Sequence, residues 1–335
     1  MIPTSRVRGS SITFRCILRR IGETLPTRSL ASTPGEQPGQ WKVRGYHISP
    51  IDYNDHVQAD GSITVEIDQK QYGIYKIQAP PDVATMSVTA CNDPACKQPG
   101  MVFENEHLSK IALILDIPSP AAIGGPNVIF KWTFADTTKA PEEPKDRYSS
   151  DVMGIEVYWE EAAGGPKTPL CMGSSGEAQL MVPQAGTLWH PRNFGRMKDQ
   201  GSVTIACEKG AIAYCRLWGY WEGYDFKRKD GTAVDKSDIQ QSCINMKLAN
   251  YCGTGPSQTM YGTEFVFTDP IDPNLHNSAT TSPEAIWTDK GAKCDGGQDA
   301  HRHKEIPTTA CAIPLCDKLD WYASPPHDFI SYLPQ

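Results

Sequence analysis

The stretch 128–134, Val-Ile-Phe-Lys-Trp-Thr-Phe, places large apolar side chains at every second position. This two-residue period is typical of a β-strand with one buried face. The same period recurs in segments on both sides of it, at Ile63, Val65 and Ile67, at Tyr75 and Ile77, at Ile155, Val157 and Trp159, and at Val203 and Ile205. Because no long amphipathic helix separates the upstream strands, the sequence predicts a mainly β fold of antiparallel sheets or a sandwich, with one or two short helices.

Residues 211–220 form a nearly continuous apolar and aromatic run, for which we predict a buried strand. A helix is predicted further on, where Ser237 and Gln240 have the spacing of a capping box. The apolar positions of this helix are Ile239, Cys243 and Met246, at helical spacing. This stripe is expected to dock on the body, with Cys243 able to pin the helix covalently and Gly253 closing it.

The chain has 335 residues, of which 39% are hydrophobic and 21% charged, an ordinary globular composition. Six arginines against one glutamate give residues 1–34 a net charge of +5, so the rest of the −7 chain carries −12. An acidic body repels phosphate backbones, which argues against nucleic acid as a partner. No stretch reaches the eighteen or so apolar residues of a membrane-spanning helix.

The cysteines point to an oxidising environment. Cys16 lies near the N-terminus, and ten others follow, at positions Cys91, Cys96, Cys171, Cys207, Cys215, Cys243, Cys252, Cys294, Cys311 and Cys316. Their number is even and none forms a C-x-x-C pair, so disulfides are favoured over a zinc site, with buried thiols as the alternative. The proline-containing loops 91–96 and 311–316 are expected to be closed or anchored turns, while the connectivity stays open.

Composition divides the chain into five parts. Residues 1–39 are expected to be a leader or disordered segment, because the first 34 are rich in Arg, Ser and Thr and nearly free of acids. Residues 40–135 form an N-terminal β region, and residues 136–150 a polar linker or surface loop. Residues 151–300 form a cysteine-rich domain, followed by a C-terminal extension at 301–335. The expected location is extracytoplasmic, secreted or periplasmic, with an organelle addressed by a transit peptide as the alternative.

The order of several motifs resembles a known family. The motifs are Leu188-Trp189-His190-Pro191, residues 201–207, residues 210–215, Trp218-Gly219-Tyr220, Ala249-Asn250-Tyr251-Cys252 and the closing segments 284–287 and 291–294. Together they resemble the ADYC-domain proteins, named for an Ala-Asp-Tyr-Cys signature near the end of a helix. The resemblance implies an exported, cysteine-rich, mostly bacterial protein of unassigned activity, and it carries no catalytic residues.

This chain has Asn250 where the family usually has Asp. A neutral amide cannot serve as a general base or as an anionic metal ligand. Asn can replace Asp only where the side chain caps or hydrogen-bonds locally. The substitution therefore favours a structural role for this position, and Asn250→Asp is expected to have little effect.

Four aromatic residues, Trp218, Tyr220, Trp221 and Tyr224, form the densest aromatic cluster and are the candidate binding residues. Exposed rings could stack on a carbohydrate or a protein surface. The alternative, which we favour, is that the rings pack the core over a disulfide at Cys215.

His190 is the weak candidate for a catalytic residue, because it lies in a loop that Ser174 and Ser175 could approach. His301 and His303, at period two, could begin a metal site with Asp295 and Asp299 nearby. A solvated polar loop is the alternative for this pair, and no catalytic motif accompanies any of the three histidines.

Two function classes therefore stay open. A binding or structural module with no cofactor is favoured, acting on a carbohydrate or protein surface. The alternative is a hydrolase or metal-dependent enzyme that uses His190, or His301 with His303.

Overall fold

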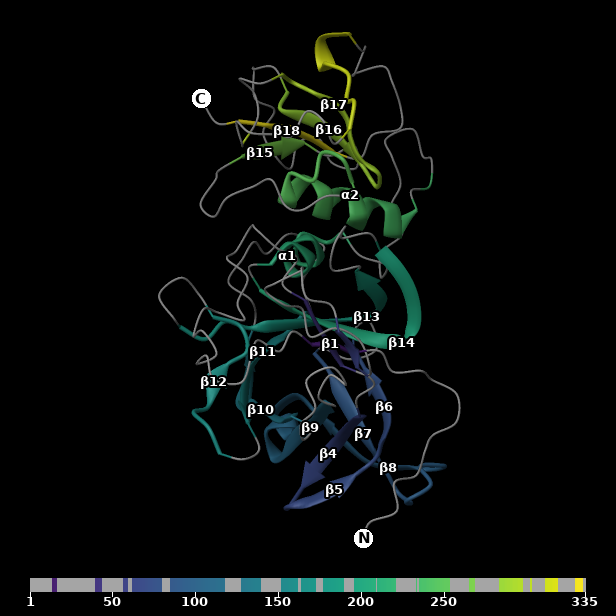
Figure 1. The fold of residues 1–335 in the computed structure, drawn as a ribbon, viewed down its shortest axis with the longest axis vertical. Coiled ribbons are helices and arrows are strands. Elements are labelled where there is room, and N and C mark those ends of the chain that lie inside the picture. The colour runs from purple at the N-terminus through teal and green to yellow at the C-terminus, as the bar shows by residue number, and fades with distance from the viewer. Residues whose placement is uncertain are drawn as a thin grey trace.

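The chain is seen in a computed structural model (Figure 1). The structure describes residues 14–16, 40–43, 57–59, 62–79, 85–117, 128–139, 152–161, 164–172, 177–189, 196–208, 210–220, 233, 235–253, 265–268, 283–297, 302, 311–318 and 329–333. Nearly all strand pairing within this part is antiparallel, and the strands form four sheets. The same part contains two α-helices and five disulfides. The prediction of a disulfide-stabilised, mainly β fold with one or two short helices is confirmed.

A nine-stranded sheet forms the larger lobe, drawn at the bottom of Figure 1. Its strand order is β2-β14-β13-β11-β10-β9-β4-β5, with β12 paired to β11. The strands are β2 (Gln40–Val43), β4 (Ser62–Ile67), β5 (Lys70–Tyr72), β9 (Ile111–Ile117), β10 (Val128–Lys139), β11 (Gly154–Glu161), β12 (Thr168–Pro169), β13 (Met181–Trp189) and β14 (Arg196–Cys207). The stretch that opened the sequence analysis thus lies in β10, between β9 and β11.

A three-stranded sheet covers one face of the large one. It consists of β6 (Ile74–Gln78), β7 (Ser87–Cys91) and β8 (Pro99–Glu104), which the 3₁₀ helix η1 (Asn105–Lys110) joins to β9. Val88 on β7, Leu113 on β9 and Trp132 on β10 are fully buried in one shared core. The alternating side chains of the two sheets therefore meet in a sandwich, as their period predicted.

One position differs from the predicted pattern in β6. Ile77 is buried but Tyr75, predicted on the same face, is 40% exposed. The register of β6 against β7 shifts between Ile74 and Lys76. This bulge inserts one residue and turns Tyr75 away from the face that Ile77 occupies.

The smaller lobe holds a four-stranded sheet of order β15-β18-β16-β17, at the top of Figure 1. Its strands are β15 (Val266–Thr268), β16 (Ala285–Thr288), β17 (Gly291–Asp295) and β18 (Phe329–Tyr332). The 3₁₀ helix η3 (Cys316–Lys318) lies between β17 and β18 in the sequence. Strand β18 comes from the last residues of the chain, yet it pairs with both β15 and β16. The segment 301–335 therefore supplies an inner strand of this sheet.

Two helices lie between the sheets (Figure 1). They are α1 (Ala211–Leu217) and α2 (Lys236–Leu248). The predicted helix from Ser237 is confirmed as α2, and its stripe of Ile239, Cys243 and Met246 is fully buried. The strand predicted over residues 211–220 is wrong, because residues 211–217 are helical.

The physical reason for this error is that α1 is buried almost all round, so its sequence has no polar face that would reveal a helical period. Gly210 begins the helix in extended backbone. The turn that ends it bonds the Gly219 amide to the Arg216 carbonyl and the Tyr220 amide to the Cys215 carbonyl, with Gly219 left-handed at φ +94°. This pair of bonds is the Schellman arrangement, in which glycine is favoured.

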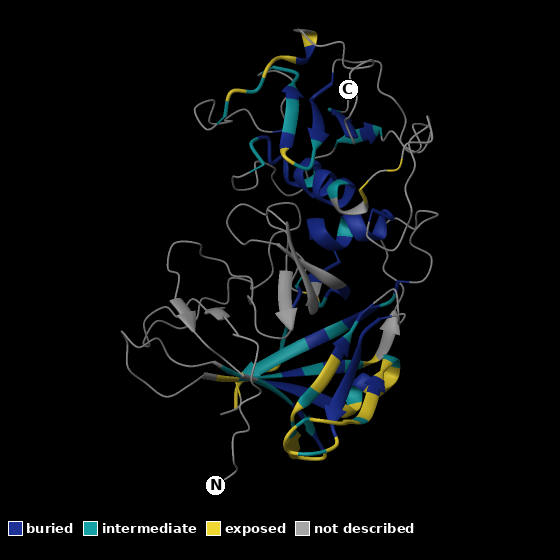
Figure 2. Cartoon of the chain, turned by 90° about the vertical axis from the view of Figure 1, so that its right-hand side faces the viewer, coloured by how far each residue is buried: buried dark blue, intermediate teal, exposed yellow. Residues whose placement is uncertain are grey.

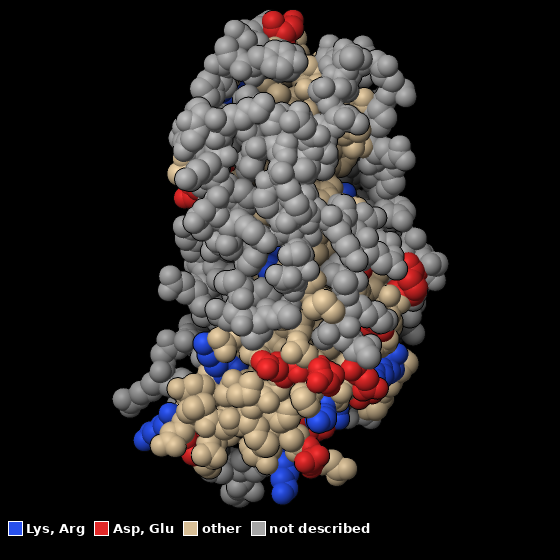
Figure 3. Space-filling view, turned by 180° about the vertical axis from the view of Figure 1, so that it is seen from behind, with Lys and Arg blue, Asp and Glu red and all other residues tan. Residues whose placement is uncertain are grey.

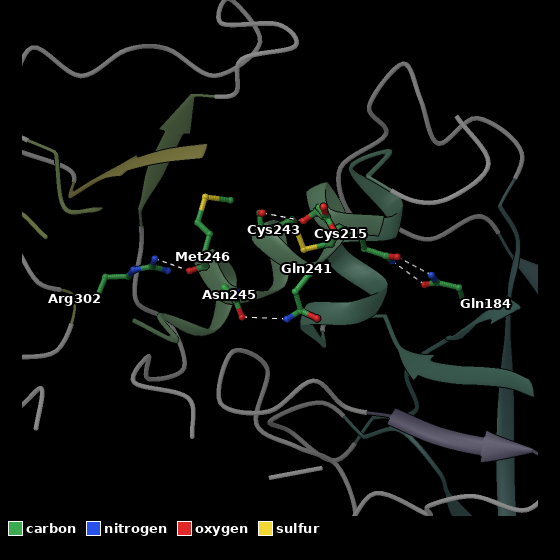
Figure 4. Close-up of a disulfide and its surroundings, with 10 residues drawn as sticks. Gln184, Cys215, Gln241, Cys243, Asn245, Met246 and Arg302 are labelled. Carbon is green, nitrogen blue, oxygen red and sulfur yellow. Dashed lines mark hydrogen bonds between the residues drawn. A yellow bond between two sulfur atoms is a disulfide. The ribbon is translucent and has the colours of Figure 1, made fainter. Parts of the chain in front are cut away.

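Buried side chains join the helices to each other and to the large sheet. The Cys215–Cys243 disulfide links α1 to α2 (Figure 4). Gln184 on β13 and Gln240 on α2 exchange two amide hydrogen bonds of 2.8 and 2.9 Å, with both side chains buried. Because such a reciprocal pair is satisfied only in one alignment, it fixes α2 against β13.

Burial falls toward the end of the larger lobe that lies away from the helices, where Figure 2 shows exposed residues gathered. Figure 3 shows charged side chains of both signs around an uncharged area on this lobe. Exposed large apolar side chains in the three-stranded sheet are Tyr75, Met101 and Val102. Within the described residues, no helix is long and apolar enough to cross a bilayer.

The predicted leader contains one described strand, β1 (Phe14–Cys16), which pairs with β3 (Val57–Ala59) in a separate two-stranded sheet. Strand β10 reaches Lys139, into the predicted linker, and the described chain resumes at residue 152.

Candidate functional site

The turn after α2 carries the Ala-Asn-Tyr-Cys tetrapeptide, residues 249–252, and we call it the signature turn. The Ala249 amide bonds the Met246 carbonyl at 3.1 Å and the Asn250 amide bonds the Asn245 carbonyl at 2.8 Å. This is a second Schellman ending, but here the left-handed position, φ +50°, holds an alanine. Its methyl group is fully buried, so packing offsets the cost of this backbone conformation.

Asn250 hydrogen-bonds across the turn rather than capping it. Its Nδ2 donates to Asn245 Oδ1 at 3.3 Å, and Gln241 Nε2 donates to the same oxygen at 3.1 Å, the latter bond visible in Figure 4. The amide nitrogen of Asn245 is already committed to the carbonyls of Thr288 and Asp289, both at 3.0 Å. The amide chain therefore ties the end of α2 to the β16–β17 hairpin.

Tyr251 hydrogen-bonds to a buried cluster of charged and polar side chains. Its hydroxyl donates to Glu284 Oε1 at 2.7 Å, while Ser331 Oγ, on β18, donates to Glu284 Oε2 at 2.7 Å. Trp287 Nε1 in turn donates to Ser331 Oγ at 2.8 Å. The signature turn and β18 thus each donate a hydrogen bond to one carboxylate, and Trp287 on β16 supports it through Ser331.

Arg302 supplies the opposite charge. Its Nε lies 2.7 and 3.0 Å from the two carboxylate oxygens of Glu284, and neither side chain has accessible surface. Its Nη2 donates to the Met246 carbonyl at 2.6 Å, shown in Figure 4, and its guanidinium lies 4.0 Å from the ring centre of Phe265. The cation therefore also complements the negative end of the α2 dipole. Nη1 of Arg302 has no hydrogen-bond partner among the described residues.

The pKa values in this cluster follow from these contacts. Burial opposes the charge of Glu284, but the Arg302 guanidinium and the hydrogen bonds from Arg302, Tyr251 and Ser331 outweigh it and lower the pKa of Glu284. Burial, followed by the Glu284 charge, strongly raises the pKa of Tyr251. The state at neutral pH is therefore a carboxylate, a guanidinium and a neutral phenol.

Close backbone packing holds the signature turn against the β16–β17 hairpin. The Ala292 amide donates to the Tyr251 carbonyl at 2.8 Å. Gly253 and Gly291 have φ of +67° and +107°, and a Cβ at Gly253 would lie 2.0 Å from the Lys290 carbonyl oxygen. Only glycine fits at either position, because any side chain would strike backbone.

Five disulfides are distributed over the two lobes. They pair Cys91 with Cys96, Cys171 with Cys207, Cys215 with Cys243, Cys252 with Cys311, and Cys294 with Cys316. The favoured disulfide interpretation is thus supported for all ten cysteines. The 91–96 loop is closed on itself, whereas the 311–316 loop is anchored at each end to a different partner.

The predicted binding residues divide into two groups. Trp218 is 7% exposed and Tyr220 1% exposed, because both lie at the end of α1 and pack in the core of the smaller lobe. They match the core alternative and offer no exposed stacking face. Trp221 and Tyr224 lie outside the described residues.

The candidate catalytic and metal residues His190, His301 and His303 also lie outside the described part of the chain. Arg302 between the two histidines is described and is buried, while the solvated-loop alternative for the histidines themselves stays a prediction. In the part of the chain that the structure describes, no three His, Cys, Asp or Glu side chains gather as a metal site.

The ADYC domain profile matches residues 124–298, just over half of the chain. The chain belongs to the ADYC domain family. No curated protein and no solved structure matches it. The ADYC signature of this chain is therefore the signature turn described above. Its Tyr251 hydrogen-bonds to Glu284, and its Cys252 forms a disulfide with Cys311.

Several residues that contact the family-matched part of the chain lie outside the matched range. Arg302 and Ser331, which neutralise and hydrogen-bond Glu284, lie beyond residue 298, as do Cys311 and Cys316. Strands β4 and β9, on the other side, precede residue 124 but complete the sheet around β10. The matched residues thus depend on both flanks of the chain.

Sequence reasoning missed the Glu284–Arg302 pair. Glu284 precedes an apolar segment that becomes β16, and Arg302 lies between two histidines. No periodicity relates the two residues, which are 18 positions apart. The available signal was the tyrosine of the signature, because a buried phenol needs a hydrogen-bond partner.

Proposed function

We propose that this ADYC protein is an exported binding or structural module that works in an oxidising compartment. The disulfide framework is the observation that carries the proposal. Five pairs use all ten cysteines of the body, and such density is typical of secreted and periplasmic proteins. A reducing cytosol would not maintain it.

The chemistry of the described residues supports binding over catalysis. The Glu284–Arg302 pair is the best-developed charged site, and its side chains have no accessible surface through which to meet a substrate. Tyr75, Met101 and Val102, by contrast, expose apolar surface on a sheet held by the Cys91–Cys96 loop. A rigid scaffold with exposed apolar groups suits contact with a partner or a carbohydrate.

The enzyme alternative depends on His190, His301 and His303, and a direct comparison tests it. The wild type and the triple variant His190→Ala/His301→Ala/His303→Ala are assayed on ester, amide, phosphoester and glycoside substrates, with and without Zn²⁺. Both are also tested for saturable binding to a glycan array and to crosslinked extracytoplasmic proteins. We expect equal binding by both proteins and no turnover. Turnover that the triple variant loses would overturn the proposal in favour of an enzyme.

A further inference from the structure

Strand β8 (Pro99–Glu104) forms one edge of the three-stranded sheet, where β7 is its only partner among the described strands. Figure 1 shows β8 at the margin of the larger lobe. Its central residues Met101 and Val102 are 48% and 56% exposed, the largest fractions among the large hydrophobic side chains that are described. Because an edge strand presents unpaired backbone amides and carbonyls, β8 offers hydrogen bonds beside an apolar centre.

Two other sheet edges carry the usual protection against strand pairing. β5 has only three residues, and its Lys70 and Gln71 are polar and exposed. The edge strand β17 is met by a backbone bridge from Leu315 to Asp295. Short, charged or covered edges resist association with another strand. β8 instead has six residues and an apolar centre, and Pro99 withholds only one amide from its edge.

The charges at the two ends of β8 complement each other. Lys97 precedes the strand and Glu104 ends it, and both are exposed. Neither has an ion-pair partner among the described residues. When two copies of β8 align antiparallel about a two-fold axis between Gly100 and Met101, Lys97 of each copy lies opposite Glu104 of the other. The apolar centres of the two strands then meet, and each positive end meets a negative one.

The start of β8 is held in place within the chain itself. The Cys91–Cys96 disulfide closes the loop that precedes the strand. Inside this loop, Asp93 Oδ2 accepts hydrogen bonds from the amides of Lys97 and Gln98, both at 3.0 Å. These bonds fix the backbone from which the Lys97 side chain extends. An edge that is ordered in advance loses little conformational entropy on association.

We infer that β8 is a self-association edge, at which two copies of this chain pair antiparallel and join their three-stranded sheets into one continuous sheet. Addition of a strand to an exposed sheet edge is a recurrent mode of protein recognition. Because both copies use the same surface, the association stops at the dimer. The contact is small, so the dimer forms and dissociates with protein concentration. This inference rests on the proposed binding function and names the partner as a second copy.

Charge reversal tests the alignment. Lys97→Glu and Glu104→Lys each set like charges opposite one another at both ends of the paired strands, where like charges repel. Each single variant should therefore dimerise about tenfold more weakly than the wild type, a difference of about 1.4 kcal/mol. The double variant Lys97→Glu/Glu104→Lys restores opposite charges at both ends and should dimerise as the wild type does. Glu104 makes no side-chain cap hydrogen bond to η1, so its reversal leaves that helix end intact.

Val102→Lys tests the apolar centre and should abolish the dimer. Ile129→Lys is the matched control, because Ile129 is 40% exposed on β10 of the large sheet and lies outside the proposed contact. Analytical ultracentrifugation of the full chain, diluted in steps from its highest soluble concentration, gives the association constant of each protein. Hydrogen exchange with mass spectrometry locates the contact, since the amides of residues 97–104 should exchange more slowly in the dimer. Near-ultraviolet circular dichroism shows that each variant is folded.

We expect a concentration-dependent dimer that Val102→Lys lacks, that Ile129→Lys retains, and that the double charge reversal restores. A wild type that stays monomeric throughout, a dimer that Val102→Lys leaves intact, or a double variant no better than the single ones would overturn the inference. A monomeric wild type that crosslinks through β8 to a different protein would equally overturn it, in favour of that partner. Glycan or partner binding by a monomeric chain would leave the proposed function intact, so the two can fail separately.

Discussion

Glu284 Oε1 accepts a hydrogen bond from the backbone amide of Arg302 at 3.1 Å as well as from its Nε at 2.7 Å. The carboxylate therefore holds both the backbone and the guanidinium of one residue. Arg302 lies outside residues 124–298, which match the family, and these two bonds fix its position in the smaller lobe. Four further contacts of the pair, to Tyr251, Ser331, Met246 and Phe265, make it the electrostatic centre of the lobe.

Glu284→Gln should destabilise the protein severely. The variant keeps the shape but leaves the Arg302 charge buried without its counter-charge, and breaking one side of such a pair costs about 3–5 kcal/mol. Urea unfolding measures the loss, with Glu104→Gln, at an exposed carboxylate, as the control. Glu284→Gln combined with Arg302→Met should recover much of it. A loss below about 1 kcal/mol would mean that the pair is not buried as described.

Acid should weaken this interaction. The pKa of Glu284 in the folded protein lies below its ordinary value of 4.5, so the pair stabilises the folded state above that pH. The stabilisation is lost as the pH falls through the lower, folded pKa. The difference in unfolding free energy between the wild type and Glu284→Gln should be constant near neutrality and shrink as the pH falls below 4.5, the ordinary pKa of the Glu284 carboxyl. A difference that grows on acidification would contradict the assignment.

Asn250→Asp should cost about 1–3 kcal/mol, contrary to the expectation from sequence. That expectation assumed that the side chain accepts a hydrogen bond, whereas its Nδ2 donates to Asn245 Oδ1. An aspartate would set a charged oxygen against that oxygen, and Asn245 cannot turn because its nitrogen bonds two carbonyls. Thermal unfolding of Asn250→Asp, and of Asn250→Leu, which removes the donor without adding a charge, measures the cost. An unchanged melting temperature for the Asp variant would disprove the donor role.

Denatured, unreduced protein should show at most one reactive thiol, because all ten cysteines of the body are paired and only Cys16 is left. Alkylation followed by mass spectrometry counts the thiols, and reduced protein gives the full number for comparison. Peptide mapping should recover the 252–311 and 294–316 pairs rather than a closed 311–316 loop. Four or more free thiols would rule out a complete framework.

Deleting residues 1–34 should leave the melting temperature nearly unchanged. The one described strand in this segment, β1, pairs with β3 in a two-stranded sheet that is separate from the three larger sheets. Differential scanning calorimetry compares the full and shortened chains. A drop of many degrees would show that the segment packs on the body.

The strands were predictable where one face of a sheet is buried and the other is not, because apolar and polar residues then alternate along the sequence. Val65 and Ile67 on β4 and Trp132 and Phe134 on β10 are of this kind. The prediction failed for α1, because an element buried on every side has no polar positions to reveal its period. The prediction failed at Tyr75 because a β-bulge changes the face of the sheet on which a side chain lies, and no residue type in the sequence indicates this bulge.

The sequence by itself determined the mainly β character, the helix with its stripe at Cys243, the even set of cysteines and the family. Each of these depends on residue types or on neighbours within a few positions. Only the tertiary structure decided which cysteines pair and how Glu284 finds Arg302. It also decided that the Asn250 side chain donates to Asn245, and that the Lys247 ammonium on α2 lies over the Tyr214 ring on α1. These are contacts between distant segments, set by how the sheets and helices pack, and short-range patterns carry no information about them.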